Sequence, residues 1–141
     1  MIVKSHEIKN KEISKYKFFL VYGENEGLKK DIINKIKSNH SSKETKYEEA
    51  QVLNNKSEFY NEINNRSLFD ENKTYLIERC SEKISEIILE FIDRDIEDLI
   101  IINCGILEKK SKLRNILEKS TKAIVIPAYK DNSRSLVDIA K

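Results

Sequence analysis

One segment of the chain has residue types and a spacing that could bind a phosphate. A buried-strand pattern at Lys17–Tyr22 is followed by Gly23 and then by a helical pattern. Phosphate loops have the form G-x-x-x-x-G-K-[ST], because glycine lets backbone amides reach the phosphates and the hydroxyl holds Mg²⁺. Counted from Gly23, Leu28 replaces the second glycine, Lys29 is retained, and Lys30 replaces the hydroxyl residue. The segment predicts the framework of a nucleotide site without its chemistry.

Acidic residues around this segment also disfavour phosphate binding. Glu24 and Glu26 place negative charge where phosphates would lie. A nucleotide hydrolase needs an acidic pair after its third strand, and Glu78 followed by Arg79 leaves at most one carboxylate there. These residues direct the search away from catalysis and toward binding.

Two polar residues near the predicted strand ends have alternative interpretations. Lys29 could contact an anion at the helix N-terminus, but we expect its side chain to lie in solvent. Asn103 ends a strand at a place where nucleotide-sensing residues often lie, and we expect it to cap the turn before the next helix. No Ser-His-Asp or Cys-His arrangement is evident from the spacing. A basic cluster near one helix start is expected to be a solvated face, with nucleic-acid binding as the alternative; it consists of Lys109, Lys110, Lys112 and Arg114.

The composition is that of a charged domain with a hydrophobic core. The 141 residues include 39% hydrophobic and 35% charged residues, and the net charge is +2. That near balance disfavours a dedicated nucleic-acid-binding protein, which is usually strongly basic. No apolar run approaches the ~18 residues of a membrane span, and the N-terminus lacks the apolar region of a secretory signal. We expect a cytoplasmic protein.

The cysteines and histidines predict no metal site. Cys80 and Cys104 each follow an apolar run and have no C-x-x-C spacing, so we expect two reduced, largely buried thiols. His6 and His40 have no companion at metal-ligand spacing.

The apolar patterns alternate between strands and helices, which predicts a mainly parallel sheet with helices on both faces. The run from Leu99 to Ile102 is typical of a strand covered on both sides. Helices are expected at Gly27–Ser38, Ser57–Asn65, Ser81–Ile92 and Glu108–Lys119, and the five strands at Lys17–Tyr22, Lys46–Val52, Lys73–Glu78, Asp98–Asn103 and Lys122–Ile126.

Both ends of the chain suggest further elements. Residues Ser5–Ser14 are compatible with a short leading helix, and a new apolar helical stripe begins near Ser133. We expect residues 1–127 to form one domain and residues 128–141 to begin a following helical domain that is truncated here.

A second informative segment is the polar connection Asn64–Asn72, which has Leu68 and Phe69 at its centre. Adjacent side chains point in different directions in a helix or strand, so the two are difficult to bury together. The pair either packs under the sheet or forms an exposed docking anchor. As an anchor, each side chain would contribute roughly 1.5–3 kcal/mol in a partner's pocket.

These segments together resemble the N-terminal domain of the delta subunit of the bacterial DNA polymerase III clamp loader. Phe19–Glu26 is similar to that family's hydrophobic strand, glycine and acidic start, and Ser67-Leu68-Phe69-Asp70 is similar to its S-L-F element. Leu99–Asn103 with Leu107–Leu113 is similar to its fourth strand and the lysine-rich helix that follows. Val125-Ile126-Pro127, followed by Leu136, is similar to its exit into the next domain. The resemblance covers nearly the whole chain.

The resemblance implies a three-layer α/β fold with a five-stranded parallel sheet, of the P-loop ATPase type (AAA+-like, RecA-like). It also implies a degenerate phosphate loop at Gly23, Leu28, Lys29 and Lys30 that binds no ATP. The expected protein is a non-catalytic subunit of the DNA polymerase III holoenzyme, a nucleotidyltransferase that replicates DNA. It would have no intrinsic activity, no catalytic residue, no metal and no cofactor.

The partner implied by the resemblance is the ring-shaped sliding clamp, the beta subunit. Leu68 and Phe69 would enter a hydrophobic pocket of the clamp, Ser67 would shape the turn, and binding would help open the ring for loading on primed DNA. In a full-length protein the ATPase motor subunits and a delta-prime-type subunit would be further partners. DNA would be contacted indirectly, and no membrane would be involved. The family's two further domains are absent from this chain, so we do not expect it to assemble a loader alone.

Two other functions remain open. A small P-loop nucleotide-binding enzyme with an atypical phosphate loop would bind ATP or GTP through Lys29 and Mg²⁺. A nucleic-acid-binding module would bind DNA through the basic cluster in a salt-sensitive manner.

Overall fold

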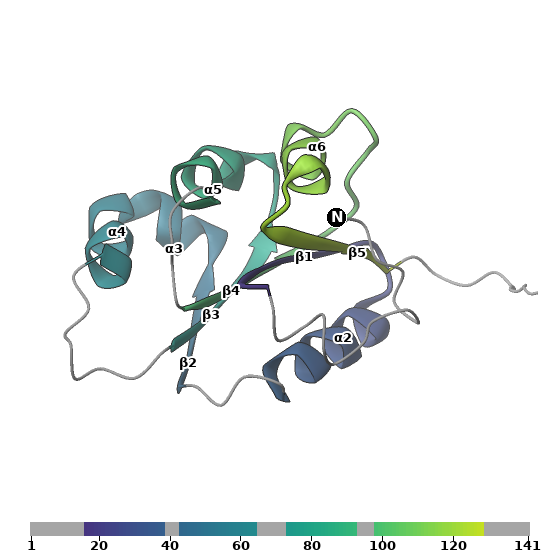
Figure 1. The fold of residues 1–141 in the computed structure, drawn as a ribbon, viewed down its shortest axis with the longest axis horizontal. Helices are drawn as coiled ribbons and strands as arrows, with labels where there is room; N and C mark the ends of the chain where they lie inside the picture. Colours follow the sequence, from purple (N-terminus) through teal and green to yellow (C-terminus); the bar gives the residue numbers. More distant parts are fainter. Residues whose placement is uncertain (1–15, 39–42, 65–72, 93–97, 129–141) are drawn as a thin grey trace, which may run out of the picture.

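Five parallel strands form one sheet in the order β2-β3-β4-β1-β5. The structure is a computed structural model, and it describes residues 16–38, 43–64, 73–92 and 98–128. Helices cover both faces of the sheet (Figure 1), as the sequence predicts. The strands are β1 (Phe18–Tyr22), β2 (Lys43–Glu48), β3 (Lys73–Cys80), β4 (Leu99–Cys104) and β5 (Ala123–Pro127).

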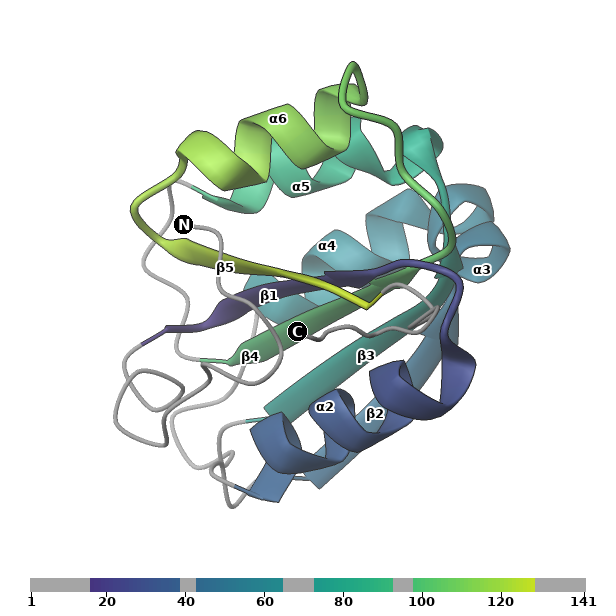
Figure 2. The same cartoon turned by 90° about the vertical axis from the view of Figure 1, so that its right-hand side faces the viewer.

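The strand order explains which helix lies on which face. The chain leaves β1 toward the far edge at β2 and then returns strand by strand, so right-handed crossovers place the first helix on one face and the later ones on the other. Of the described helices, α2 (Glu26–Ser38) alone lies on one side (Figure 2). The opposite side carries α3 (Glu49–Asn54), α4 (Lys56–Asn64), the short 3-10 helix η2 (Glu82–Ile84), α5 (Ser85–Ile92) and α6 (Lys112–Lys119).

The core is divided into two layers by the alternation of side chains along the strands. On β1, Phe18, Leu20 and Tyr22 face the helices α3 to α6, whereas Phe19 and Val21 face α2. All five side chains are buried, because β1 lies inside the sheet between β4 and β5. This burial on both faces explains why β1 is a continuous apolar run.

The segment after β2 differs from the sequence prediction. A strand was expected at Lys46–Val52, but β2 ends at Glu48 and helix α3 begins at the next residue. Glu48 and Gln51 form a reciprocal capping box that fixes the helix start. The buried carboxylate of Glu49 then accepts hydrogen bonds from the backbone amide and the hydroxyl of Ser81, at 2.6 and 2.8 Å. Hydrogen bonds of polar residues therefore set the start of this helix, and the apolar periodicity of the sequence gives no signal for them.

Helix α6 is also shorter than predicted. It begins at Lys112 rather than Glu108, because Ser111 caps it by accepting a hydrogen bond from the Arg114 amide. The carboxylate of Glu82 reinforces the same end, accepting from the Ser111 hydroxyl and from the amides of Lys112 and Leu113. An acidic group at a helix N-terminus is favourable because the free amides carry partial positive charge.

Several predictions fall outside the described residues. These are the leading helix at Ser5–Ser14, the stretch from Ser133, and the start of a second domain beyond residue 128. Within the described ranges every helix has 13 residues or fewer, so none could cross a membrane.

A pair of adjacent residues on α5 tests how the core stabilises the fold. Ile88→Ala should lower the free energy of unfolding by about 2–5 kcal/mol, because Ile88 is 1% exposed and its removal leaves a cavity under the sheet. Leu89→Ala is the matched control, since Leu89 is 40% exposed on the same helix, and we expect it to cost about 0.5 kcal/mol or less. Urea unfolding of both variants measures the difference. Equal losses would contradict the assigned orientation of α5.

Candidate functional site

The candidate site lies at the carboxyl ends of β1 and β4. From β1 the chain leads into α2 on one face, and from the adjacent β4 it leads toward α6 on the other (Figure 2). Such a divergence opens a crevice in parallel sheets, and ligands commonly bind there. The sequence-predicted residues Gly23, Lys29 and Asn103 are all brought to this edge, together with Glu78 at the end of β3.

Gly23 occupies the turn after β1 because no other residue fits. Its φ is +131°, and a Cβ built on it would lie 2.1 Å from the carbonyl oxygen of Ala128. The backbone just after β5 therefore presses against this turn. Only glycine combines the positive φ with such a close approach.

Backbone carbonyls of the chain itself accept hydrogen bonds from the amides of the loop after β1. The Gly23 amide donates to the carbonyl of Gly105 at 3.0 Å, and the Asn25 amide donates to the carbonyl of Ala128 at 3.1 Å. The Ala128 amide returns a hydrogen bond to the Tyr22 carbonyl at 2.6 Å. In a working phosphate loop such amides point at the ligand. Here they join β1 to the segments that follow β4 and β5.

Asn25 satisfies the next donors of the loop. Its side-chain oxygen accepts a hydrogen bond from the Leu28 amide at 3.0 Å, as an N-cap residue does. Its carbonyl accepts from the Lys29 amide at 3.0 Å. The start of α2 is thus capped from within the chain.

Lys29 does not lie in solvent, and the expectation of a solvated lysine was wrong. Its side chain is 3% exposed. The ammonium group donates to the carbonyl of Cys104 at 2.8 Å and lies 3.0 Å from the carboxylate of Glu26. The lysine lies at the crevice between β1 and β4, where it lines one wall and links α2 to the end of β4. The buried carbonyl and the nearby carboxylate compensate its charge.

The neighbours of Lys29 serve other roles. Leu28, at the position of the missing second glycine, packs against the apolar cluster under α2. Lys30, at the position of the missing hydroxyl, is exposed, as are Glu24 and Glu26.

A bulge at the end of β3 shapes the next part of the edge. Ile77 pairs with Ile102 and Cys80 with Cys104, so β3 carries one residue more than β4 over this interval. Arg79 accommodates the bulge with a φ of +55°. Its exposed guanidinium lies 3.0 Å from the carboxylate of Glu48. The positive φ is unusual for a residue with a side chain and marks local strain.

Two adjacent hollows open at this edge, with volumes of about 330 and 300 Å³. Both are lined by Glu26, Glu78 and Asn103. The side-chain oxygen of Asn103 is buried and accepts no hydrogen bond, so the expectation that Asn103 caps the next turn was wrong. It lies within β4, and Ser111 caps α6 instead. The walls carry charges of both signs, because Lys30, Lys37 and Lys46 also line one hollow and Lys29 and Arg79 line the other.

Arg114 does not belong to the exposed basic cluster that the sequence suggested near the start of α6. Arg114 donates to the carboxylate of Glu118 at 2.7 Å and to the Leu107 carbonyl at 3.2 Å, and it lies over the ring of Tyr22. It is therefore a packing residue of α6. Lys109, Lys110 and Lys112 are exposed, which agrees with both a solvated face and a nucleic-acid surface.

The predicted anchors Ser67, Leu68 and Phe69 lie outside the described residues. The chain is described up to Asn64 at the end of α4 and again from Lys73 at the start of β3. Over the described ranges, no group of three or more His, Cys, Asp or Glu residues could hold a metal ion.

Sequence reasoning missed the groups that close the site. The carbonyls of Gly105 and Ala128 are backbone atoms, so residue types give no signal for them. Knowing that β1 lies between β4 and β5 would have placed both carbonyls beside Gly23.

A glycine pair tests the closed loop. Gly23→Ala should destabilise the fold by about 2–4 kcal/mol, because the added methyl group collides with the Ala128 carbonyl and the positive φ is strained. Gly27→Ala is the control, since its Cβ would meet only the Asn25 side chain at 3.7 Å; in the first turn of α2 it should be neutral or stabilise by up to about 1 kcal/mol. Thermal or urea unfolding reports both. A tolerated Gly23→Ala would refute the contact with Ala128.

Comparisons with known proteins assign this chain to no family. No family model matches the chain, and no curated protein matches it at a significant level.

Proposed function

We propose that this chain is a non-catalytic module that binds a sliding clamp, with Leu68 and Phe69 as its anchors and Ser67 shaping their turn. It would act in DNA replication as a subunit of the clamp loader that serves the polymerase III holoenzyme, in the cytoplasm. The observation that carries the proposal is the adjacent Leu-Phe pair in the polar connection between α4 and β3. Its similarity to the S-L-F element of clamp-loader delta subunits supplies the partner.

The closed loop after β1 supports a binding role over nucleotide chemistry. Two of its amides, those of Gly23 and Asn25, already donate to carbonyls of the same chain, and Lys29 is committed to the Cys104 carbonyl. A nucleotide would have to displace these contacts before it gained any of its own. On this proposal, the loop is a degenerate phosphate site of an AAA+-like or RecA-like domain, and ATP acts through other subunits of the loader.

The chain path also separates the two ends of the sheet. Residues 65–72 join the end of α4 to Lys73, the first residue of β3. They therefore lead to the end of the sheet at which the parallel strands begin. The Gly23 loop lies at the opposite end of the sheet, where the strands finish. A partner docking through residues 67–69 therefore need not disturb the Lys29 contacts.

The proposed interaction would act on the clamp by selective affinity. A ligand shifts a conformational equilibrium only by the difference between its affinities for the two states. Anchors that fit the pocket better in an open clamp protomer would favour the open ring. The domain then supplies contact energy, and neighbouring motor subunits decide when the anchors are accessible.

Replacing both anchors tests the proposal. Leu68→Ala with Phe69→Ala in the full chain should weaken binding to the sliding clamp of the same organism about 100-fold or more, because two buried side chains contribute roughly 3–6 kcal/mol together. Surface plasmon resonance measures the affinity, and circular dichroism checks that the fold persists.

Ile106→Ala is the matched control for this test. Ile106 is an apolar residue that is 66% exposed after β4, at the opposite edge of the sheet. We expect its replacement to leave clamp affinity unchanged. Clamp binding that survives the loss of both anchors, or an unaltered chain that does not bind the clamp, would refute the proposal.

A small nucleotide-binding enzyme with an atypical phosphate loop is the second candidate. The observation that favours it is the unpaired side-chain oxygen of Asn103 beside two hollows at the usual ligand edge. The same hollows carry cationic side chains beside the carboxylates of Glu26 and Glu78, so their charge does not decide for or against a phosphate. The loop amides of Gly23 and Asn25, which a phosphate would need, already donate to carbonyls of the same chain. The clamp-binding proposal is therefore preferred.

A further inference from the structure

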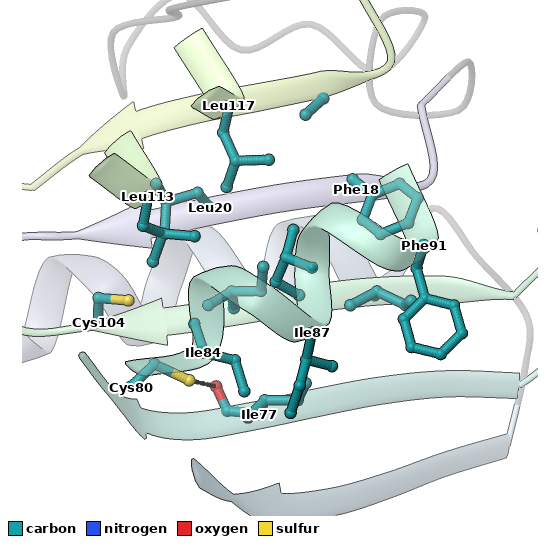
Figure 3. Close-up of a cluster of buried hydrophobic side chains, with 14 of the residues drawn as sticks. Phe18, Leu20, Ile77, Cys80, Ile84, Ile87, Phe91, Cys104, Leu113 and Leu117 are labelled. Carbon is teal, nitrogen blue, oxygen red and sulfur yellow. Dashed lines mark hydrogen bonds between the residues drawn. The ribbon is translucent and has the colours of Figure 1, made fainter. Parts of the chain in front are cut away.

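Two cysteines from distant parts of the chain meet on one face of the sheet. Cys80 ends β3 and Cys104 ends β4, and they are register partners in the parallel pairing of these strands. Both belong to the apolar cluster beneath α5 and α6 and are free thiols. Figure 3 shows their side chains at the same end of the two strands.

The bulge in β3 creates this juxtaposition. Side chains alternate along a strand, so two residues an odd number of positions apart normally point to opposite faces. Ile77 and Cys80 are three positions apart, yet both lie in the cluster under α5 and α6. The extra residue, accommodated by the positive φ of Arg79, turns Cys80 onto the face of Cys104.

The spacing of the two strands suits a covalent link. Paired residues on neighbouring strands are separated by the strand spacing of about 4.8 Å, and disulfides join Cα atoms about 4.4–6.8 Å apart. The bulge interrupts the ladder between Ile77 and Cys80, and the pairing resumes at Cys80 and Cys104. The thiol of Cys80 donates to the Ile77 carbonyl at 3.3 Å, and this contact would be released.

We propose that Cys80 and Cys104 form a dithiol that a two-electron oxidant of the diazene or peroxide class converts into an intramolecular disulfide. With diamide, one thiolate adds to the N=N bond, and the second thiolate then attacks the first sulfur. The sulfur–nitrogen bond breaks as the sulfur–sulfur bond forms. The two thiols lose two electrons and two protons, and the diazene leaves as the hydrazine.

Cys80 is the thiol that meets the oxidant first. It is 6% exposed at the end of its strand, whereas Cys104 is fully buried. Burial raises the pKa of the Cys80 thiol, and the neighbouring Cys104 thiol raises it further. Because the thiolate is the reactive form, we expect the reaction to be slower than that of an exposed cysteine.

The disulfide would link the bulged end of β3 covalently to the end of β4, beside the candidate site. Cys80 follows Glu78 and Arg79, whose side chains line the hollow there, and the Cys104 carbonyl holds the Lys29 ammonium. Oxidation would lock these segments together. The proposal does not depend on clamp binding, and each can fail without the other.

Mass spectrometry of the native full chain after diamide treatment tests the proposal. Intact mass should show a monomer that has lost two hydrogens and resists alkylation in denaturant. Peptide mapping without reductant should yield a peptide pair linked through Cys80 and Cys104, and dithiothreitol should reverse both changes. Cys80→Ser and Cys104→Ser are controls that should each remain alkylatable at the other cysteine and form no internal link.

Thermal melting supplies the second readout. If the fold holds the two sulfurs together, the oxidised monomer should melt several degrees above the reduced chain, because the cross-link restricts the unfolded state. Two alkylatable thiols after diamide treatment, or only intermolecular dimers, would overturn the proposal. An oxidised monomer that melts below the reduced chain would overturn the claim that the spacing of the two strands suits the link, because the fold would have to distort to form it.

Discussion

The close contact between Gly23 and Ala128 is the constraint on which the arrangement of the site depends. The Ala128 carbonyl lies where a side chain at Gly23 would be, and it accepts a hydrogen bond from the Asn25 amide. This contact holds the turn after β1 against the end of β5, while Gly105 holds the same turn against the end of β4. Three neighbouring strands of the sheet are thereby joined at their carboxyl ends by backbone hydrogen bonds.

The buried Lys29 completes this closure and changes the meaning of the phosphate-loop pattern. In a complete phosphate loop, the lysine at the start of the first helix binds the phosphates. Here the ammonium group binds the Cys104 carbonyl and the Glu26 carboxylate. The same residue type at the same place thus stabilises the scaffold, in keeping with a proposed function that needs no bound nucleotide.

The sequence predicted the layers well and the polar contacts poorly. Continuous apolar runs in β1 and β4 are visible in the residues, because both strands are buried on both faces. Residues 49–52 of helix α3 were predicted as strand, since the start of this helix depends on the contacts of Glu48, Gln51 and Glu49. Lys29 was expected in solvent and Asn103 at a cap, because strand order decides what lies beside them. The bulge that aligns Cys80 with Cys104 likewise has no sequence signature.

The amides of the loop after β1 offer the most direct test of this account. Hydrogen exchange followed by nuclear magnetic resonance, with and without millimolar MgATP, reports whether the chain or a nucleotide occupies them. We predict that the Gly23 and Asn25 amides are protected and that MgATP changes neither their exchange nor their chemical shifts. Rapid exchange of these amides in the free chain, or a saturable shift on adding MgATP, would contradict the claim that the chain's own backbone fills the site.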